Sequence, residues 1–186
     1  MNRSKKALLT FCVTLVLCCV GAGTATAHIT GSDHRTNVDV WLIATNVPST
    51  WQTALINSAL TWDNVPSQCH DFHRITSGTP EMTVYRDNID GEGGAHAFAS
   101  ASHNAVTFDS REDWNYDINR TSYPSGLDVW GVGTHEFGHN LSLVHSSSTY
   151  PWDTMAASPP SGATSFIWRS LEPHDQVRER NLYPGC

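Results

Sequence analysis

The sequence predicts an α+β fold within a single domain that covers residues 28–186. Apolar segments of strand-like length and pattern alternate with segments whose apolar residues recur at helical spacing. No internal repeat and no Pro/Gly-rich linker divides the chain after residue 27. The 159 residues beyond that point are enough to bury the core of one domain.

Residues 1–27 have the pattern of an export signal. A basic start is followed by the apolar run Ala7–Val20 and by Ala25-Thr26-Ala27, a small-residue cleavage site. The run is too short for a membrane span, and a lipoprotein would need a small residue where Leu17 precedes Cys18. We therefore expect a secreted, extracellular chain that holds no membrane segment after cleavage.

The predicted mature chain is acidic. Eight arginines and no lysine remain after residue 27, against 18 acidic residues, so the formal net charge is −10. Such a charge disfavours binding to phosphate backbones, and we expect no nucleic-acid partner.

Two cysteines remain after cleavage, Cys69 and Cys186. In an exported chain they favour one disulfide, which would contribute up to about 4 to 5 kcal/mol by closing a long loop. The alternative is a pair of free thiols, which mass spectrometry under non-reducing conditions distinguishes.

The first half of the domain contains three predicted strands and one helix. Val38–Thr45 has the composition of a buried strand, and the turn Pro48–Thr50 offers a helix cap before apolar residues at helical spacing in 51–65. Phe72–Thr76 and Glu81–Ile89 then predict two strands.

The second half contains two more predicted strands and two helices. Residues 95–102 alternate small and larger side chains, as an edge strand does, and 104–110 form another short strand. Ser125 is the predicted cap of a helix over 127–141, because an acid follows three residues later. The chain ends in a predicted helix over 171–183.

The segment "HEFGHNLSLVH" contains a candidate metal site. His135 and His139 lie four residues apart, so on a helix both imidazoles can reach one ion. This is the H-E-x-x-H pattern of zinc peptidases, and His145 becomes a third ligand if the chain turns after the helix. Three imidazoles leave one position for a zinc-bound water, which Glu136 can activate as the general base.

This segment resembles the metzincin zinc peptidases, and the matrixin branch in particular. The resemblance implies a secreted zinc endopeptidase that acts on polypeptides as a monomer. It implies a twisted, mostly parallel sheet with an antiparallel edge strand, an active-site helix and a C-terminal helix. It also implies a Met-turn at Met155, as an apolar floor beneath the histidines, and a sharp turn at Ser142, where the family has a glycine at positive φ.

The resemblance extends upstream over "DGEGGAHAFAS" and "VTFDSREDW". It implies a calcium site at Asp90, Asp109 and Glu112. It also implies that an extended substrate pairs with the edge strand; the residues concerned are Ala95, His96, Ala97 and Phe98. Because Thr107 replaces a ligand of the family's structural zinc, we expect one zinc ion rather than two.

Two other functions are open at this point. The chain could be a non-catalytic extracellular module that binds metal and a partner, although such a module has no need of Glu136 as a base. It could also hydrolyse an amide bond outside proteins. Assays on proteins, peptides and cell-wall fragments distinguish these alternatives.

Overall fold

The computed structural model describes residues 40–66, 71–100, 104–119, 126–160 and 163–183. The strands are β1 (Val40–Ile43), β2 (His73–Ile75), β3 (Met82–Asp87), β4 (Ala97–Ser100), β5 (Ala105–Asp109), β6 (Trp114–Asn115) and β7 (Leu127–Asp128). The helices are α1 (Gln52–Asp63), α2 (Val129–Asn140) and α3 (Pro173–Leu182), with 3₁₀ turns η1 (Ser49–Trp51) and η2 (Ser165–Arg169).

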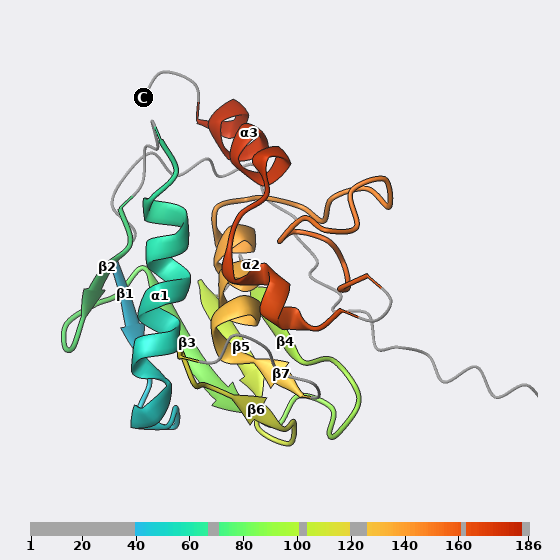
Figure 1. The fold of residues 1–186 in the computed structure, drawn as a ribbon. Helices are drawn as coiled ribbons and strands as arrows, with labels where there is room; N and C mark the ends of the chain where they lie inside the picture. Colours follow the sequence, from blue (N-terminus) through green and yellow to red (C-terminus); the bar gives the residue numbers. More distant parts are fainter. Residues whose placement is uncertain (1–39, 67–70, 101–103, 120–125, 161–162, 184–186) are drawn as a thin grey trace, which may run out of the picture.

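A five-stranded sheet forms one layer of the fold, in the order β2-β1-β3-β5-β4 (Figure 1). The pairs β1–β2, β1–β3 and β3–β5 are parallel, whereas β4 runs antiparallel to β5 and forms one end of the sheet. This arrangement confirms the predicted α+β class, the mostly parallel sheet and the antiparallel edge strand.

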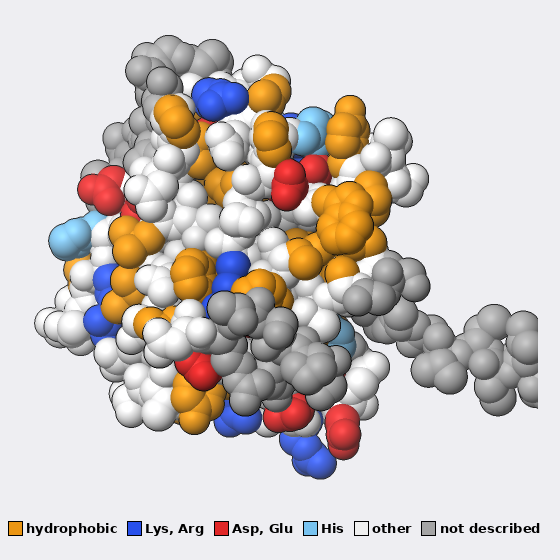
Figure 2. Space-filling view, viewed as in Figure 1, with side chains coloured by type: hydrophobic (Ala, Val, Ile, Leu, Met, Phe, Trp, Pro, Cys, Tyr) orange, Lys and Arg blue, Asp and Glu red, His pale blue; other side chains and the backbone are white. Residues whose placement is uncertain are grey.

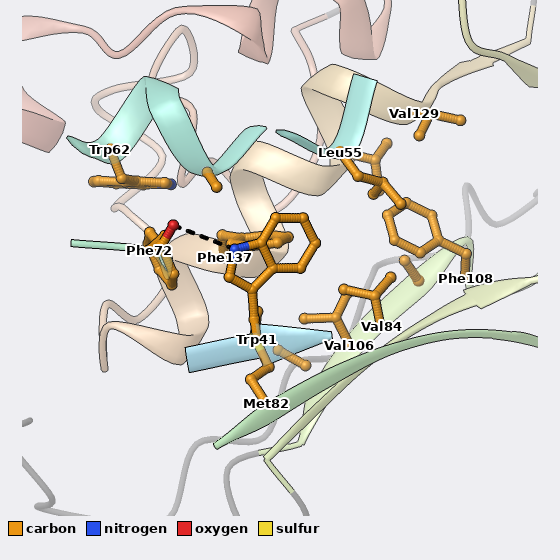
Figure 3. Close-up of a cluster of buried hydrophobic side chains, with 14 of the residues drawn as sticks. Trp41, Leu55, Trp62, Phe72, Met82, Val84, Val106, Phe108, Val129 and Phe137 are labelled. Carbon is orange, nitrogen blue, oxygen red and sulfur yellow. Dashed lines mark hydrogen bonds between the residues drawn. The ribbon is translucent and has the colours of Figure 1, made fainter. Parts of the chain in front are cut away.

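The core lies between this sheet and the helices α1 and α2, which lie over one of its faces (Figures 1 and 3). The Phe137 ring of α2 packs edge-on against Trp41 of β1 and against Phe72, at centroid distances of 5.2 and 5.1 Å. The indole of Trp62 in α1 donates a hydrogen bond of 2.7 Å to the Thr134 carbonyl of α2. These contacts fix α2 to both the sheet and α1.

The start of α2 differs from the prediction. Its N-cap is Asp128 and not Ser125; the Asp128 carboxylate accepts a hydrogen bond from the Gly131 N–H at 3.1 Å. The reason is that Leu127 and Asp128 pair with Trp114 and Asn115 as the small sheet β6–β7. Extended backbone at these residues delays the helix to Val129.

Several short elements were not predicted, and one predicted cap was wrong. The 3₁₀ turn η1 begins within the predicted turn Pro48–Thr50 and ends at Trp51, and no side chain caps either η1 or α1. The elements β6, β7 and η2 are too short to produce a periodic pattern in the sequence. α3 is capped as a capping box by Glu172 and Asp175, with Pro173 at its first position.

Charges are mixed on the surface. In the face that Figure 2 shows, basic side chains of the described residues stand scattered among acidic and apolar ones. Among the described helices, none has the combination of length and apolar composition that a membrane crossing needs.

Replacing Gly131 with alanine should destabilise the fold by about 3 kcal/mol. A Cβ atom there would lie 1.9 Å from the backbone oxygen of Ser165, so η2 would have to move away from α2. Urea denaturation measures the change, and Thr53→Ala on the exposed side of α1 is the control, with an expected change within about 0.5 kcal/mol. Equal stability of the two variants would contradict the close contact of η2 and α2.

Candidate metal centre

The second half of α2 carries His135 and His139 one helical turn apart. Both side chains are buried, and their Nε2 atoms lie 3.1 Å from each other. Burial lowers the pKa of His135 to about 3 and that of His139 well below its usual value, so both rings are neutral. Neutral imidazole is the form that binds a metal ion.

A turn at the end of α2 returns the chain toward these two rings. Ser142 has a φ of +66°, the left-handed conformation expected there. The N–H groups of Ser142 and Leu143 donate to the carbonyls of His139 and Gly138, at 2.9 and 3.1 Å. This is the Schellman pattern of helix termination, with Ser142 at the position where glycine is commonest.

Beyond this turn, His145 completes a group of three rings. Its Nε2 atom lies 3.2 Å from that of His135. Donor atoms of His135, His139 and His145 all lie within 4.8 Å of one another, and this is the group among the described residues that could hold a metal ion. Nitrogen ligands at about 2.05 Å around a tetrahedral zinc lie roughly 3.3 Å apart, close to the two spacings seen here.

The other ring nitrogens determine where the lone pairs point. Nδ1 of His135 lies 2.6 Å from the Thr154 carbonyl, and Nδ1 of His139 lies 2.7 Å from the Leu143 carbonyl. A carbonyl only accepts, so each Nδ1 must carry the proton and each Nε2 is a bare lone pair. Bare lone pairs facing each other repel, and a cation between them removes the repulsion. The donor set therefore fits a zinc ion.

Glu136 lies next to the first of these ligands and is also buried. Burial raises the pKa of its carboxyl group to about 8, although a hydrogen bond from the Ala99 backbone lowers it. Within the described part of the chain, its Oε2 atom has no hydrogen-bond partner. The raised pKa makes this group a stronger base, and when a cation held by the neighbouring histidines keeps it ionised, the oxygen without a partner is suited to accept a proton from a bound molecule.

Met155, the residue of the predicted Met-turn, packs against α2, the helix that carries His135 and His139. Its side chain is fully buried, and its sulfur packs so closely on Gly138 of α2 that a Cβ there would lie 2.4 Å from it. The carbonyl of Met155 accepts a hydrogen bond from the Ser146 N–H at 2.8 Å. The segment after His145 is thereby held against α2.

Two residues that support the site were not predicted from the sequence. The buried Asp175 carboxylate of α3 accepts hydrogen bonds from the backbone N–H groups of Thr154 and Met155, at 2.7 and 3.3 Å. It thus orients the Thr154 carbonyl, which accepts the hydrogen bond from Nδ1 of His135. Trp168 of η2 stacks on the His135 ring at a centroid distance of 4.7 Å. The Glu-Pro-x-Asp start of α3 marks Asp175 as a cap, but no sequence pattern indicates Trp168.

The carboxylates predicted as calcium ligands accept hydrogen bonds from backbone N–H groups of the loop 90–95. Asp109 accepts from the N–H groups of Asp90 and Gly91 at 3.2 and 3.3 Å, and Glu112 accepts from the Gly93 N–H at 2.6 Å. The Asp90 carboxylate accepts from the Ala95 N–H at 2.9 Å. The three carboxylates thus surround one loop, and calcium binding there stays a prediction.

The remaining predicted residues are those of the substrate-binding strand, the disulfide and the signal segment. Ala97 and Phe98 lie in β4, whose outer edge has no neighbouring strand among the described residues, and Ala95 and His96 lead into it. The proposed disulfide partners Cys69 and Cys186, and the signal segment 1–27, fall outside the described residues.

Comparison with known proteins identifies related sequences. The family model for matrixin peptidases matches residues 43–155. Mouse matrix metalloproteinase-25 is 34% identical over 103 residues, which are 53% of this chain and 16% of that protein. Human matrix metalloproteinase-26 is 31% identical over 113 residues, covering 54% of this chain and 40% of that protein. Human matrix metalloproteinase-17 is 38% identical over 93 residues, covering 43% of this chain and 15% of that protein. The matched region thus spans less than half of each of these relatives.

Replacing Ser142 with glycine should stabilise the chain by about 0.5 to 1 kcal/mol, because glycine adopts positive φ without steric cost. The matched control is Ser148→Gly, in the exposed loop after His145, where φ is not positive and glycine should not stabilise. Urea denaturation of both variants measures the difference. A loss of stability in Ser142→Gly would contradict the strained turn.

Calcium should raise the melting temperature if the loop carboxylates bind it. At free calcium a hundredfold above the dissociation constant, the stabilisation is about 2.7 kcal/mol, or several degrees. Asp109→Asn should abolish the shift, whereas Asp71→Asn, at an exposed carboxylate before β2, should keep it. An unchanged melting temperature of the parent chain with calcium or with chelator would rule out the site.

Proposed function

The chain belongs to the matrixin family, and from that premise we propose that it is a secreted zinc endopeptidase that hydrolyses peptide bonds in polypeptides. His135, His139 and His145 are the zinc ligands in this proposal, and Glu136 is the general base. The observation that carries it is the convergence of three imidazole rings, two buried and one half-buried, beside a carboxylate oxygen that has no partner among the described residues. A module that only bound metal would not require that carboxylate.

The chemistry divides between the ion and the chain. Bound zinc supplies a Lewis acid, which makes a water molecule acidic near neutral pH and polarises the scissile carbonyl. Glu136 accepts a proton at its free Oε2 atom and returns it to the leaving amine. Thr154 and Leu143 keep the imidazole protons at Nδ1, so that the ligand nitrogens stay available.

Strand β4 supplies a way to align the substrate. It is the last strand of the sheet within the described part of the chain, so its outer backbone groups can pair with an extended polypeptide. Ala99 of β4 also contacts the Glu136 carboxylate through its backbone N–H. A peptide paired along this strand therefore runs past the general base.

Export completes the proposal. Residues 1–27 are the signal segment, residues 28–186 are the catalytic domain, and Cys69 pairs with Cys186 after export. The acidic, lysine-free composition of 28–186 disfavours nucleic acid as a partner, and a monomer with a polypeptide substrate is the proposed working form.

Glu136→Gln should keep bound zinc and lower kcat by about 10²- to 10⁴-fold, because the amide cannot accept the proton. The measurement is cleavage of casein and of a quenched peptide library, with zinc quantified in the same samples. Asp71→Asn makes the same carboxylate-to-amide change at an exposed residue and should retain full activity.

The controls separate this function from its alternatives. Removing zinc with a chelator should stop cleavage, and adding zinc back should restore it. A parent chain that holds zinc at one ion per molecule and cleaves no protein or peptide would contradict the proposal and favour a metal-binding module.

A further inference from the structure

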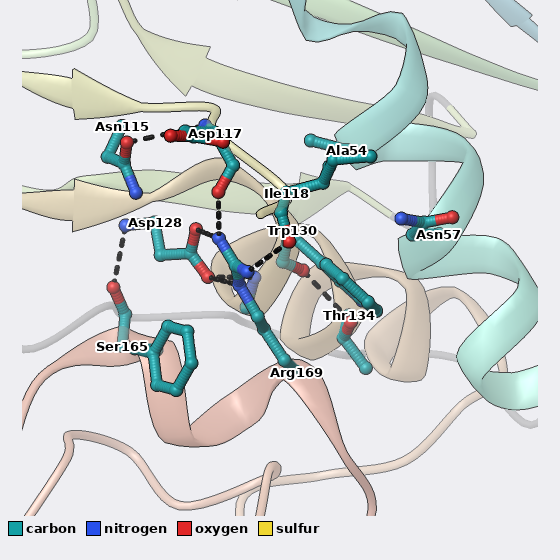
Figure 4. Close-up of polar contacts among 12 residues, drawn as sticks. Ala54, Asn57, Asn115, Asp117, Ile118, Asp128, Trp130, Thr134, Ser165 and Arg169 are labelled. Atoms are coloured by element: carbon teal, nitrogen blue, oxygen red, sulfur yellow. Dashed lines mark hydrogen bonds and ion pairs between the residues drawn. The ribbon is translucent and has the colours of Figure 1, made fainter. Parts of the chain in front are cut away.

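A buried ion pair joins η2 to the start of α2. The guanidinium of Arg169 donates from Nε to Asp128 Oδ2 at 2.6 Å and from Nη2 to Asp128 Oδ1 at 2.7 Å. The exposed fractions of the two side chains are 9% and 1%. Two parallel bonds of this kind match the planar guanidinium to the planar carboxylate, a geometry that lysine cannot reproduce (Figure 4).

The rest of the guanidinium is also enclosed. Nη2 donates to the Asp117 carbonyl at 2.9 Å and Nη1 to the Ile118 carbonyl at 3.3 Å. The Trp130 and Phe166 rings lie 4.9 and 4.6 Å from its central carbon. Arg169 therefore has one orientation, fixed by three different segments of the chain.

The partner of Arg169 is the N-cap of the helix that carries the metal ligands. Asp128 accepts from the Gly131 N–H within α2, and its own N–H donates to the Ser165 hydroxyl of η2 at 2.8 Å. No space for a side chain exists between Gly131 and the Ser165 backbone. The first turn of α2 and η2 are thus locked together.

The residue next to Arg169 reaches a metal ligand. Trp168 is buried and stacks on His135 with an interplanar angle of 24°. His135 lies seven residues after Asp128, about two turns along α2. The short element η2 therefore touches α2 at its cap through Arg169 and at its first histidine through Trp168.

We propose that Arg169 is a positioning residue for the metal ligand His135, because its bond to Asp128 fixes η2 and so holds Trp168 against the imidazole. This assignment rests on the proposed function, in which His135 binds zinc. Arg169 does not touch the ligand and takes no part in the reaction.

Two restraints together define the orientation of the His135 ring. The hydrogen bond to Thr154 fixes one ring nitrogen, and the stacked indole fixes the plane of the ring. If η2 moves, the His135 ring can rotate about its Nδ1 hydrogen bond. Its Nε2 lone pair then no longer points to the position that the three histidines share for the ion. Groups that orient ligands in this way affect metal affinity about 10- to 100-fold when they are removed.

The buried ion pair between Arg169 and Asp128 is better explained by positioning than by a contribution to stability. Desolvation of both charges offsets most of their attraction, so a buried pair adds little stability compared with apolar residues of the same volume. Its directional bonds do fix the relative placement of two segments. Here the two segments are the cap of the ligand helix and the turn that packs on the ligand.

The test measures zinc affinity by competition with a chromophoric chelator on the purified full chain. Arg169→Met and the double variant Asp128→Asn with Arg169→Met should bind zinc about 10-fold or more weakly. The double variant leaves no unpaired buried charge, and asparagine is as good an N-cap as aspartate, so it keeps the fold intact. Arg169→Lys should not restore the affinity, because lysine cannot form the paired bonds.

Arg86→Met is the matched control. Arg86 also donates to a backbone carbonyl, that of Ser110 at 2.7 Å, and lies over a tryptophan ring, that of Trp51. It lies in β3, away from η2 and α2. Its loss should leave zinc affinity within twofold of the parent chain.

Two further measurements separate positioning from general stability. The visible absorption of the cobalt-substituted chain should change in the double variant, because it reports the arrangement of the ligands. In a double-mutant cycle, Trp168→Leu and Arg169→Met should be non-additive in zinc affinity, because both act through the same stacked ring.

Zinc affinity within twofold of the parent chain and an unchanged cobalt spectrum in the double variant would overturn the assignment, even if the melting temperature fell. A parent chain that retained no zinc would overturn the proposed function and this assignment with it. A parent chain that held zinc and cleaved peptides, with unaffected Arg169 variants, would overturn this assignment alone.

Discussion

The hydrogen bond from an imidazole Nδ1 to a backbone carbonyl is the interaction on which the site depends. It appears twice, from His135 to Thr154 and from His139 to Leu143. Each bond fixes the proton on one nitrogen and leaves the other as a lone pair. Without these bonds, the neutral rings could exchange protons and hydrogen-bond to each other, and no common point for a cation would exist.

Much of the surrounding structure serves to place those two carbonyls. The left-handed turn at Ser142 brings Leu143 back over the end of α2, with the residue after it leading to His145. Asp175, at the start of α3, holds the backbone N–H groups of Thr154 and Met155. Elements far apart in the sequence thus place the two carbonyl oxygens that orient the imidazoles, while the sheet and α1 both pack against α2.

The sequence predicted the parts whose structure follows from local pattern. The strands of the five-stranded sheet and helix α1 follow from the pattern of apolar residues, α2 was predicted from a capping pattern, and the histidines follow from one turn of helix plus a bend. The resemblance implied a turn at Ser142, where the family has a glycine, and left open whether serine would be strained there or the turn would differ; the positive φ of Ser142 decides for the strained turn. The cap was misplaced, because the pairing of Leu127 and Asp128 with Trp114 and Asn115 is a contact between distant segments. Trp168 and Arg169 were missed for the same reason, since their partners lie more than 30 residues away.

The central claim is that three ring nitrogens share one zinc ion beside Glu136. Anomalous diffraction at the zinc edge, from crystals of the full chain grown with one equivalent of zinc, tests it most directly. The account predicts a single strong peak at about 2.0 to 2.1 Å from Nε2 of His135, His139 and His145. A peak elsewhere, or a His145 ring turned away from the other two with no ion between them, would contradict it.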